Sequence, residues 1–223
     1  MNEQQASLDA LKDIRNMMEK SSRFISLSGW SGVAAGTCAL VGAWFGNNII
    51  SQSKLHHDSL RNHYDYDTKE SSIAVTEYMG SPLFRIACVT LLAAIVLAFI
   101  FTYIRSKKTR TPLWGVASRK LTLSVGIPMV IGGIYLLKLM EAGAFGLIAP
   151  GCLLFYGLGL VNAAKYTLGE IKWLGYGQLL LGVISLFFNG YGIYFWALGF
   201  GVLHIVYGII MWWKYERPTT ADA

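Results

Sequence analysis

The sequence predicts an all-α membrane protein, a polytopic bundle of six transmembrane helices with an amphipathic helix before it. Only 14% of the 223 residues are charged and 54% are apolar. Soluble domains carry about 25% charged residues. The apolar residues also gather in long runs, and a run of about 20 is enough to cross the hydrocarbon core of a bilayer. These runs are continuous rather than alternating, which favours helices over the strands of a closed barrel.

The first 23 residues are predicted to lie in the cytoplasm and to form an amphipathic helix over residues 6–23. Leu8, Leu11, Ile14 and Met17 recur every three or four residues and make one apolar stripe. Such a helix either lies on the inner leaflet or against the bundle, or it docks a cytoplasmic partner. The apolar run that follows is too long for a signal peptide, so the first span is expected to be retained.

A transmembrane domain is predicted over residues 24–213, followed by a cytoplasmic tail over residues 214–223. The six predicted spans cover residues 24–49, 82–104, 121–140, 142–164, 173–188 and 191–213. The one long connection between them, residues 50–81, is predicted to be an outer loop.

Short breaks between the apolar runs predict two helical hairpins. Asn189-Gly190 is expected to make a tight turn between the last two spans, and residues 141–143 join the third span to the fourth. Pro128 and Pro150 lie within predicted spans and are expected to kink them.

The distribution of positive charge predicts the orientation. Fourteen of the nineteen Lys and Arg residues fall on the side of the N-terminus and five on the other side. Positively charged loops are retained in the cytoplasm. We therefore expect both termini to be cytoplasmic. This arrangement explains the net charge of +6 without a nucleic-acid partner.

The 24 glycines predict close helix packing. Ser28, Gly32 and Gly36 are four residues apart on the first span, and stripes of small residues let helix backbones approach closely. Other glycines recur at a spacing of seven, which keeps a small residue on one helix seam. These pairs are Gly126/Gly133, Gly175/Gly182, Gly192/Gly199 and Gly201/Gly208.

His204 is the main candidate for a functional residue, because it falls near the middle of the last predicted span. An ionisable group at that depth is a functional candidate by default. Gln178 and Ser185 of the preceding antiparallel span could hydrogen-bond to it. Two interpretations stay open, a neutral histidine that joins two helices and a proton-relay or substrate site.

No metal, cofactor or disulfide site is predicted. Cys38, Cys88 and Cys152 all lie in apolar runs and are interpreted as packing residues. The outer loop carries three histidines and three aspartates without a repeated ligand spacing, and whether they bind a metal is left open. They are His56, His57, Asp58, His63, Asp65 and Asp67.

Gly29-Trp30-Ser31-Gly32 spells G-x-S-G, and with His204 it resembles the serine–histidine pair of rhomboid intramembrane proteases. A histidine can take the proton of a serine hydroxyl. In rhomboids the serine lies on the fourth span, whereas Ser31 lies on the first, near the inner surface. An intramembrane hydrolase is therefore only a remote alternative.

Two segments resemble uncharacterised six-span membrane proteins of Bacteroidota. They are MMEKSSRFISLSG, which leads into the first span, and WALGFGVLHIVYGIIM in the last. The resemblance implies the six-span architecture and a place in the cytoplasmic (inner) membrane of a bacterium. No activity is established for that family, so it implies none.

The function expected from the sequence is non-enzymatic. The chain is predicted to act in the lipid bilayer through protein partners, lipids or self-association, because packing residues dominate and few polar groups lie within the spans. The alternative is a small transporter or channel with a polar path around His204, Gln178 and Ser185.

Overall fold

A computed structural model of the chain describes residue 5 and residues 28–61, 80–109 and 114–217. Every secondary-structure element in these ranges is a helix. The α-helices are α2 (Gly29–Arg61), α4 (Pro82–Thr109), α5 (Val116–Glu141), α6 (Ile148–Ala163), α7 (Ile171–Ser185), α8 (Gly192–Trp196) and α9 (His204–Tyr215). A short 3-10 helix, η1 (Phe145–Leu147), precedes α6, and a π-helix, η2 (Ala197–Leu203), joins α8 to α9.

Five stretches of these helices are long and apolar enough to cross a membrane. They are Gly29–Gln52, Pro82–Thr109, Val116–Glu141, Phe145–Ala163 and Gly192–Tyr215. They coincide with five of the six predicted spans, and an all-helical, membrane-embedded chain is thereby supported.

The fifth predicted span corresponds to α7, which has only 15 residues. At 1.5 Å per residue α7 is about 22 Å long, whereas the hydrocarbon core of a bilayer is about 30 Å thick. The length of α7 alone therefore does not establish a sixth span.

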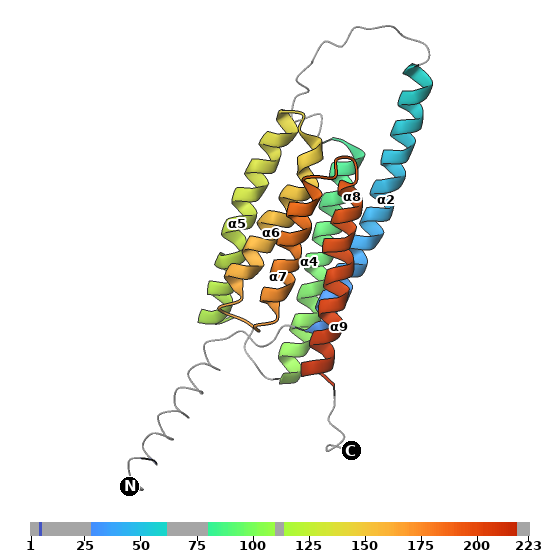
Figure 1. Ribbon diagram of the computed structural model, residues 1–223. Coiled ribbons are helices and arrows are strands. Elements are labelled where there is room, and N and C mark those ends of the chain that lie inside the picture. Colours follow the sequence, from blue (N-terminus) through green and yellow to red (C-terminus); the bar gives the residue numbers. More distant parts are fainter. Residues whose placement is uncertain (1–4, 6–27, 62–79, 110–113, 218–223) are drawn as a thin grey trace.

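The helices form one bundle with two parts (Figure 1). In one part α6 lies between α5 and α7, and in the other α2 lies between α4 and α9. Contacts of α6 with α8, and of α7 with η2, join the two parts. The outermost helices are the least buried, and the most apolar stretch of α4 has no buried residue. The main core cluster lies between α6 and α7, around Leu160, Ile171 and Leu174, and Tyr207 of α9 packs against it.

The contact between α2 and α9 is a contact of backbones. A Cβ added at Gly208 would lie 2.5 Å from the Gly29 carbonyl oxygen, and one added at Gly36 would lie 2.6 Å from the Gly201 carbonyl oxygen. No side chain fits in such a gap. The prediction that the first span packs through small residues is confirmed.

The pairs of glycines spaced by seven do not all lie on packing seams. Added Cβ atoms at Gly175 and Gly182 would collide with side chains of α6. By contrast, Cβ atoms at Gly126 and Gly133 would have no described atom within 4 Å. The prediction was wrong for this last pair, because spacing does not reveal which face of α5 meets a neighbour.

Both predicted hairpins are present, and each turns at a glycine with positive φ. Gly143, after α5, has φ +69°, and the Ala144 amide donates to the Leu139 carbonyl at 2.9 Å, as in a Schellman motif. Gly190, between α7 and α8, has φ +88°. This region of φ strains residues that have a Cβ.

The two prolines occupy different environments. Pro128 lies in the interior of α5. Pro150 lies in the first turn of α6, directly after η1. A proline is tolerated in a first turn because that turn has fewer backbone bonds to lose.

The predicted outer loop is shorter than expected, because α2 does not end at residue 49. The helix continues to Arg61 and rises beyond the other helices (Figure 1). His56, His57 and Asp58 therefore belong to a helix. The other predicted ligands, residues 63, 65 and 67, and the predicted amphipathic helix over residues 6–23 lie outside the described residues.

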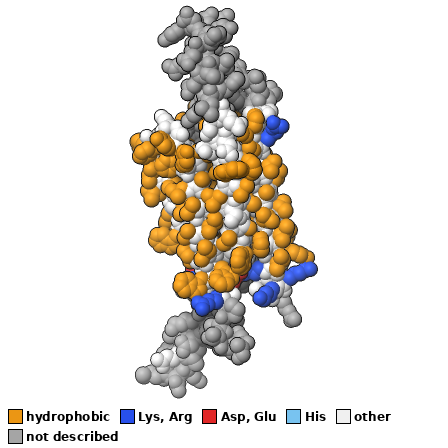
Figure 2. All heavy atoms as spheres, turned by 90° about the vertical axis from the view of Figure 1, so that its right-hand side faces the viewer, with side chains coloured by type: hydrophobic (Ala, Val, Ile, Leu, Met, Phe, Trp, Pro, Cys, Tyr) orange, Lys and Arg blue, Asp and Glu red, His pale blue; other side chains and the backbone are white. Residues whose placement is uncertain are grey.

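The surface separates apolar from charged side chains along the bundle axis. Hydrophobic side chains cover the middle of the face in Figure 2, and Lys and Arg lie at its two ends. We call the end with the C-terminus of α9 the lower end, as in Figure 1. Most described cations belong to helix ends or connections at the lower end. They are Arg105, Lys107, Lys108, Arg119, Lys120, Lys165, Lys172, Lys214 and Arg217.

Candidate functional site

His204 is the first residue of α9 and directly follows the π-helix η2. Its side chain is buried, at 7% exposure. The residue lies midway along the stretch Gly192–Tyr215 that could cross a membrane. A π-helical turn widens the helix and is frequent at functional sites. Here the turn leaves the Gly199 carbonyl to accept side-chain hydrogen bonds.

Both ring nitrogens of His204 have partners. Nδ1 lies 3.0 Å from the Gly199 carbonyl oxygen, and Nε2 lies 2.8 Å from the Tyr156 hydroxyl of α6. A carbonyl can only accept, so Nδ1 carries the hydrogen and Nε2 accepts from Tyr156. The arrangement holds a neutral imidazole of one tautomer between two helices.

Gln178 of α7 is fully buried and lies next to this histidine. Its Nε2 donates to the Gly199 carbonyl at 2.8 Å. The same nitrogen is 3.5 Å from Nδ1 of His204. Both of these nitrogens are donors, so they share the Gly199 carbonyl and do not bond to each other. The carbonyl therefore links η2, α7 and α9.

Ser185, the third candidate from the sequence, is not joined to His204. It is buried, and its hydroxyl has no hydrogen-bond partner among the described residues. It lies seven residues beyond Gln178 on α7, which is about 10 Å along the helix. The structure thus brings Gln178 and His204 together and places Ser185 farther along the same helix.

Aromatic rings enclose the imidazole. The ring centroids of Tyr156 and Phe200 lie 5.4 and 6.0 Å from that of His204, at interplanar angles of 28° and 18°. Trp196 packs next to Phe200, at 5.2 Å. These rings cover the histidine, which is 7% exposed.

The sequence analysis missed Tyr156, which makes the closest contact to His204. It lies within an apolar run of α6 and is separated from His204 by 48 positions. One signal was available, since a buried tyrosine usually finds a partner for its hydroxyl. The sequence offers no means of identifying that partner.

Four buried side-chain polar atoms in the described part of the chain have no hydrogen-bond partner. They are Glu170 Oε2, Tyr207 OH, Gln178 Oε1 and Ser185 Oγ. Gln178 touches His204, and Tyr207 lies one helical turn from it on α9. Tyr207 and Tyr156 also pack on the same cluster of Leu160, Ile171 and Leu174. The unpartnered groups therefore surround the histidine site or extend from it along the bundle.

Glu170 marks the lower end of this polar series, in the connection before α7. Its Oε1 accepts hydrogen bonds from Lys214 and, at 2.7 Å, from the Tyr215 hydroxyl. Partial burial raises the pKa of Glu170, but the bonds from Lys214 and Tyr215 outweigh it. The net result is a lowered pKa, so Glu170 is ionised at neutral pH.

Glu216 holds three helix ends together at the same end of the bundle. Its carboxylate accepts from the Gly29 amide at 2.5 Å and from the Ser28 hydroxyl at 3.3 Å. It also pairs with Arg105 of α4. A carboxylate at the first amide of α2 satisfies a free backbone donor and complements the helix dipole.

Ser31 and His204 do not form a catalytic pair in this structure. The Ser31 hydroxyl donates to the Ser28 carbonyl at 2.5 Å. Both ring nitrogens of His204 are bonded to other groups. The described residues also contain no group of three His, Cys, Asp or Glu side chains that could hold a metal ion.

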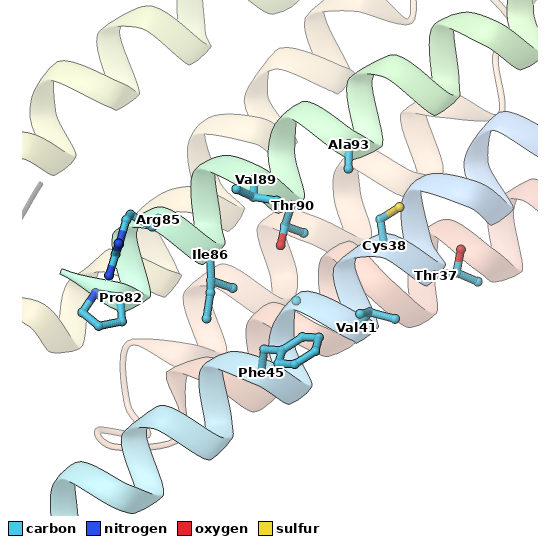
Figure 3. Close-up of a pocket in the computed structure, with 11 residues that line it drawn as sticks. Thr37, Cys38, Val41, Phe45, Pro82, Arg85, Ile86, Val89, Thr90 and Ala93 are labelled. Carbon is cyan, nitrogen blue, oxygen red and sulfur yellow. The ribbon is translucent and has the colours of Figure 1, made fainter. Parts of the chain in front are cut away.

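A groove of about 590 Å³ runs between α2 and α4 on the membrane-facing surface. Its walls are mostly apolar, with Val41 and Phe45 on α2 and Ile86 and Val89 on α4 (Figure 3). The Thr37 hydroxyl on the α2 wall bonds to its own helix, at the Ala34 carbonyl. The Arg85 side chain lies at the Pro82 end of the groove, and no ion pair found among the described residues involves it.

Comparisons with known proteins give no relative for this chain. No protein-family model matches it, and neither a curated protein nor a solved structure shows significant similarity.

Proposed function

We propose that the chain is a six-span protein of the bacterial cytoplasmic membrane that acts by binding lipids, protein partners or copies of itself rather than by catalysis. Its site for a membrane component is the groove between α2 and α4. The occupant that fits this groove best is an anionic phospholipid. The pairing of both His204 nitrogens and of the Ser31 hydroxyl inside the protein supports a non-catalytic role.

The connections of α7 support the sixth span. Its two ends join helices of the opposite direction through short segments, and apolar residues 186–188 extend it. The concentration of cations at the lower end supports placing that end, which includes the C-terminus of α9, in the cytoplasm. With six spans, the N-terminus then lies on the same side.

The observation that carries the lipid proposal is an apolar groove with Arg85 near one end, an arginine that no ion pair found among the described residues involves. The groove extends from Pro82 to Ala93 on α4, which is about 17 Å of helix. Acyl chains match apolar walls, and a guanidinium matches the geometry of a phosphate. The charge and the shape thus fit the two parts of one lipid.

Native mass spectrometry of the protein, extracted gently from its own membrane, tests this proposal. We expect a bound anionic phospholipid on most molecules and at least a several-fold lower retained fraction in Arg85→Gln. The matched control is Lys138→Gln. Lys138 is also exposed and belongs to the same end of the bundle, but it is paired with Glu141.

Equal lipid retention in the two variants would contradict the site. A protein bound in fixed ratio, with no lipid, would contradict the lipid proposal and favour a protein partner. In that case the undescribed N-terminal segment would be the first region to delete.

A further inference from the structure

We propose that His204 is a reversible proton-binding site that exchanges protons with water at the lower end of the bundle. The path consists of buried water molecules and the side chains of Glu170, Tyr207 and Tyr156. This inference is independent of the lipid groove, which lies on the other side of α2.

The first argument is where the unpartnered polar atoms lie. The described part of the chain has four such buried atoms, and they belong to Glu170, Tyr207, Gln178 and Ser185. None belongs to the packing seam between α2 and α4 or to that between α5 and α6. Buried polar groups without a protein partner are the usual binding sites of internal water. Their concentration around α7 and α9 therefore indicates a row of internal water sites along these helices, the hydrated line.

The second argument is the continuity of the lower half of that line. The Tyr215 hydroxyl bonds to Glu170 at 2.7 Å, and the other Glu170 oxygen is buried and has no partner among the described residues. The Tyr207 hydroxyl is buried without a partner among the described residues, and Tyr207 packs on the same cluster of Leu160, Ile171 and Leu174 as Tyr156. Tyr156 in turn bonds to Nε2 of His204 at 2.8 Å. Hydroxyl groups that can both donate and accept thus lie between the charged end and the histidine, and water molecules on either side of Tyr207 would complete the path.

The third argument is the tautomer. Nδ1 of His204 donates its hydrogen to the Gly199 carbonyl. Nε2 therefore carries no hydrogen, and its lone pair faces the Tyr156 hydroxyl. Tyr156 gives its hydroxyl proton to Nε2 and takes one from Tyr207 or from water. Tyr207 is restored in the same way by water near Glu170. One proton moves from the lower aqueous end to the imidazole, which becomes an imidazolium, and the two tyrosines end as neutral as they began.

The other face of the imidazole does not continue the path. Nδ1–H donates to a backbone carbonyl, and this group cannot pass a proton onward. Gln178 Oε1 and Ser185 Oγ lie beyond it, on the side of α7 that leads to the upper end. His204 therefore gains and loses its proton through the lower end. A proton would cross the bundle only if the hydrogen bond between Nδ1 and the Gly199 carbonyl broke.

Other charged groups near the site lie at the same end. Lys214 forms an ion pair with Glu170. Arg105 and Glu216 form another, where α2 and α4 meet the end of α9. On α2, the residues that face His204 are Gly32 and its neighbours, which carry no charge. Among the described residues, no ion pair with a carboxylate holds the imidazole permanently protonated.

Solid-state NMR of the full-length protein in lipid bilayers, with ¹⁵N-labelled histidine, tests the proposal. The His204 signals are assigned by their loss in His204→Asn. We expect magnetisation to pass from water to the His204 ring nitrogens. We also expect Tyr207→Phe to slow proton exchange at Nε2 by at least about tenfold, since it removes one proton-transfer group. The matched control, Tyr176→Phe, changes a half-exposed tyrosine of α7 and should leave the rate unchanged.

Two results would overturn the proposal. If the His204 nitrogens of the wild-type protein receive no magnetisation from water, no internal water reaches the histidine and its role is only structural. The same conclusion follows if Tyr207→Phe and Tyr176→Phe exchange at the same rate. The wild-type measurement decides the question even if Tyr207→Phe fails to fold.

Discussion

The Tyr156 hydroxyl lies 2.8 Å from Nε2 of His204 and connects α6 to α9 at the centre of the bundle. Because the Gly199 carbonyl takes the Nδ1 hydrogen, this bond runs from the Tyr156 hydroxyl to Nε2. Together with the Gly199 carbonyl, it ties α6, α7, η2 and α9 at one point.

Tyr156→Phe should destabilise the protein by about 1 kcal/mol, since it removes one buried hydrogen bond and leaves Nε2 without a donor. The measurement is equilibrium unfolding of the purified protein in mixed detergent. Tyr176→Phe, which loses only an exposed hydroxyl, should unfold at the wild-type midpoint. A Tyr156→Phe midpoint that matches this control would mean that the bond contributes nothing to stability.

Gly208→Ala should be far more damaging than its size suggests, because the new methyl would lie 2.5 Å from the Gly29 carbonyl. The two helices would have to move apart to relieve this overlap, and the free energy of unfolding should fall by about 1–3 kcal/mol. Gly133→Ala is the matched control, with open space around its Cβ. Because alanine is the better helix former, the control should be as stable as wild type or up to about 1 kcal/mol more stable. Similar losses in both variants would argue against the close contact of α2 with α9.

Glu170 should make stability depend on pH. Its hydrogen bonds from Lys214 and Tyr215 lower its pKa below the unfolded value, despite partial burial. The folded state therefore holds the proton less tightly than the unfolded state. The stabilisation is present above the unfolded pKa and is lost as the pH falls through the folded pKa. The free energy of unfolding should fall less between neutral and acidic pH for Glu170→Gln than for wild type. An identical pH dependence in the two proteins would contradict the role of this carboxylate.

Ser31 should not react with a fluorophosphonate probe, because its hydroxyl donates to the Ser28 carbonyl and both His204 nitrogens bond to other groups. The measurement is in-membrane labelling followed by mass spectrometry, with a known serine hydrolase as the positive control. Labelling that disappears in Ser31→Ala would revive the hydrolase alternative and require a rearrangement of both Ser31 and His204.

Some of the candidate site could be anticipated and some could not. His204 and Gln178 were visible as polar residues in apolar runs, and the hairpin before the last span made their proximity reasonable. Tyr156, Tyr207 and Glu170 were not identified, because their roles depend on neighbours far away in the chain. Glu170, for example, is 44 positions from Lys214. Ser185 was grouped with His204 from its helix alone, whereas the register of α7 against α9 keeps them apart.

The sequence by itself determined the class of fold, five helices able to cross a membrane, two hairpin turns and the glycine-rich face of α2. These features are local, since hydropathy over about 20 residues and a positive φ at one glycine need no knowledge of the rest of the chain. The tertiary structure decided which glycines meet a neighbour, how far α2 extends and which tyrosine bonds to His204. Those outcomes depend on how each helix is rotated and which helix it packs against. That choice follows from shape and hydrogen bonding between distant segments, not from the polarity of any one of them.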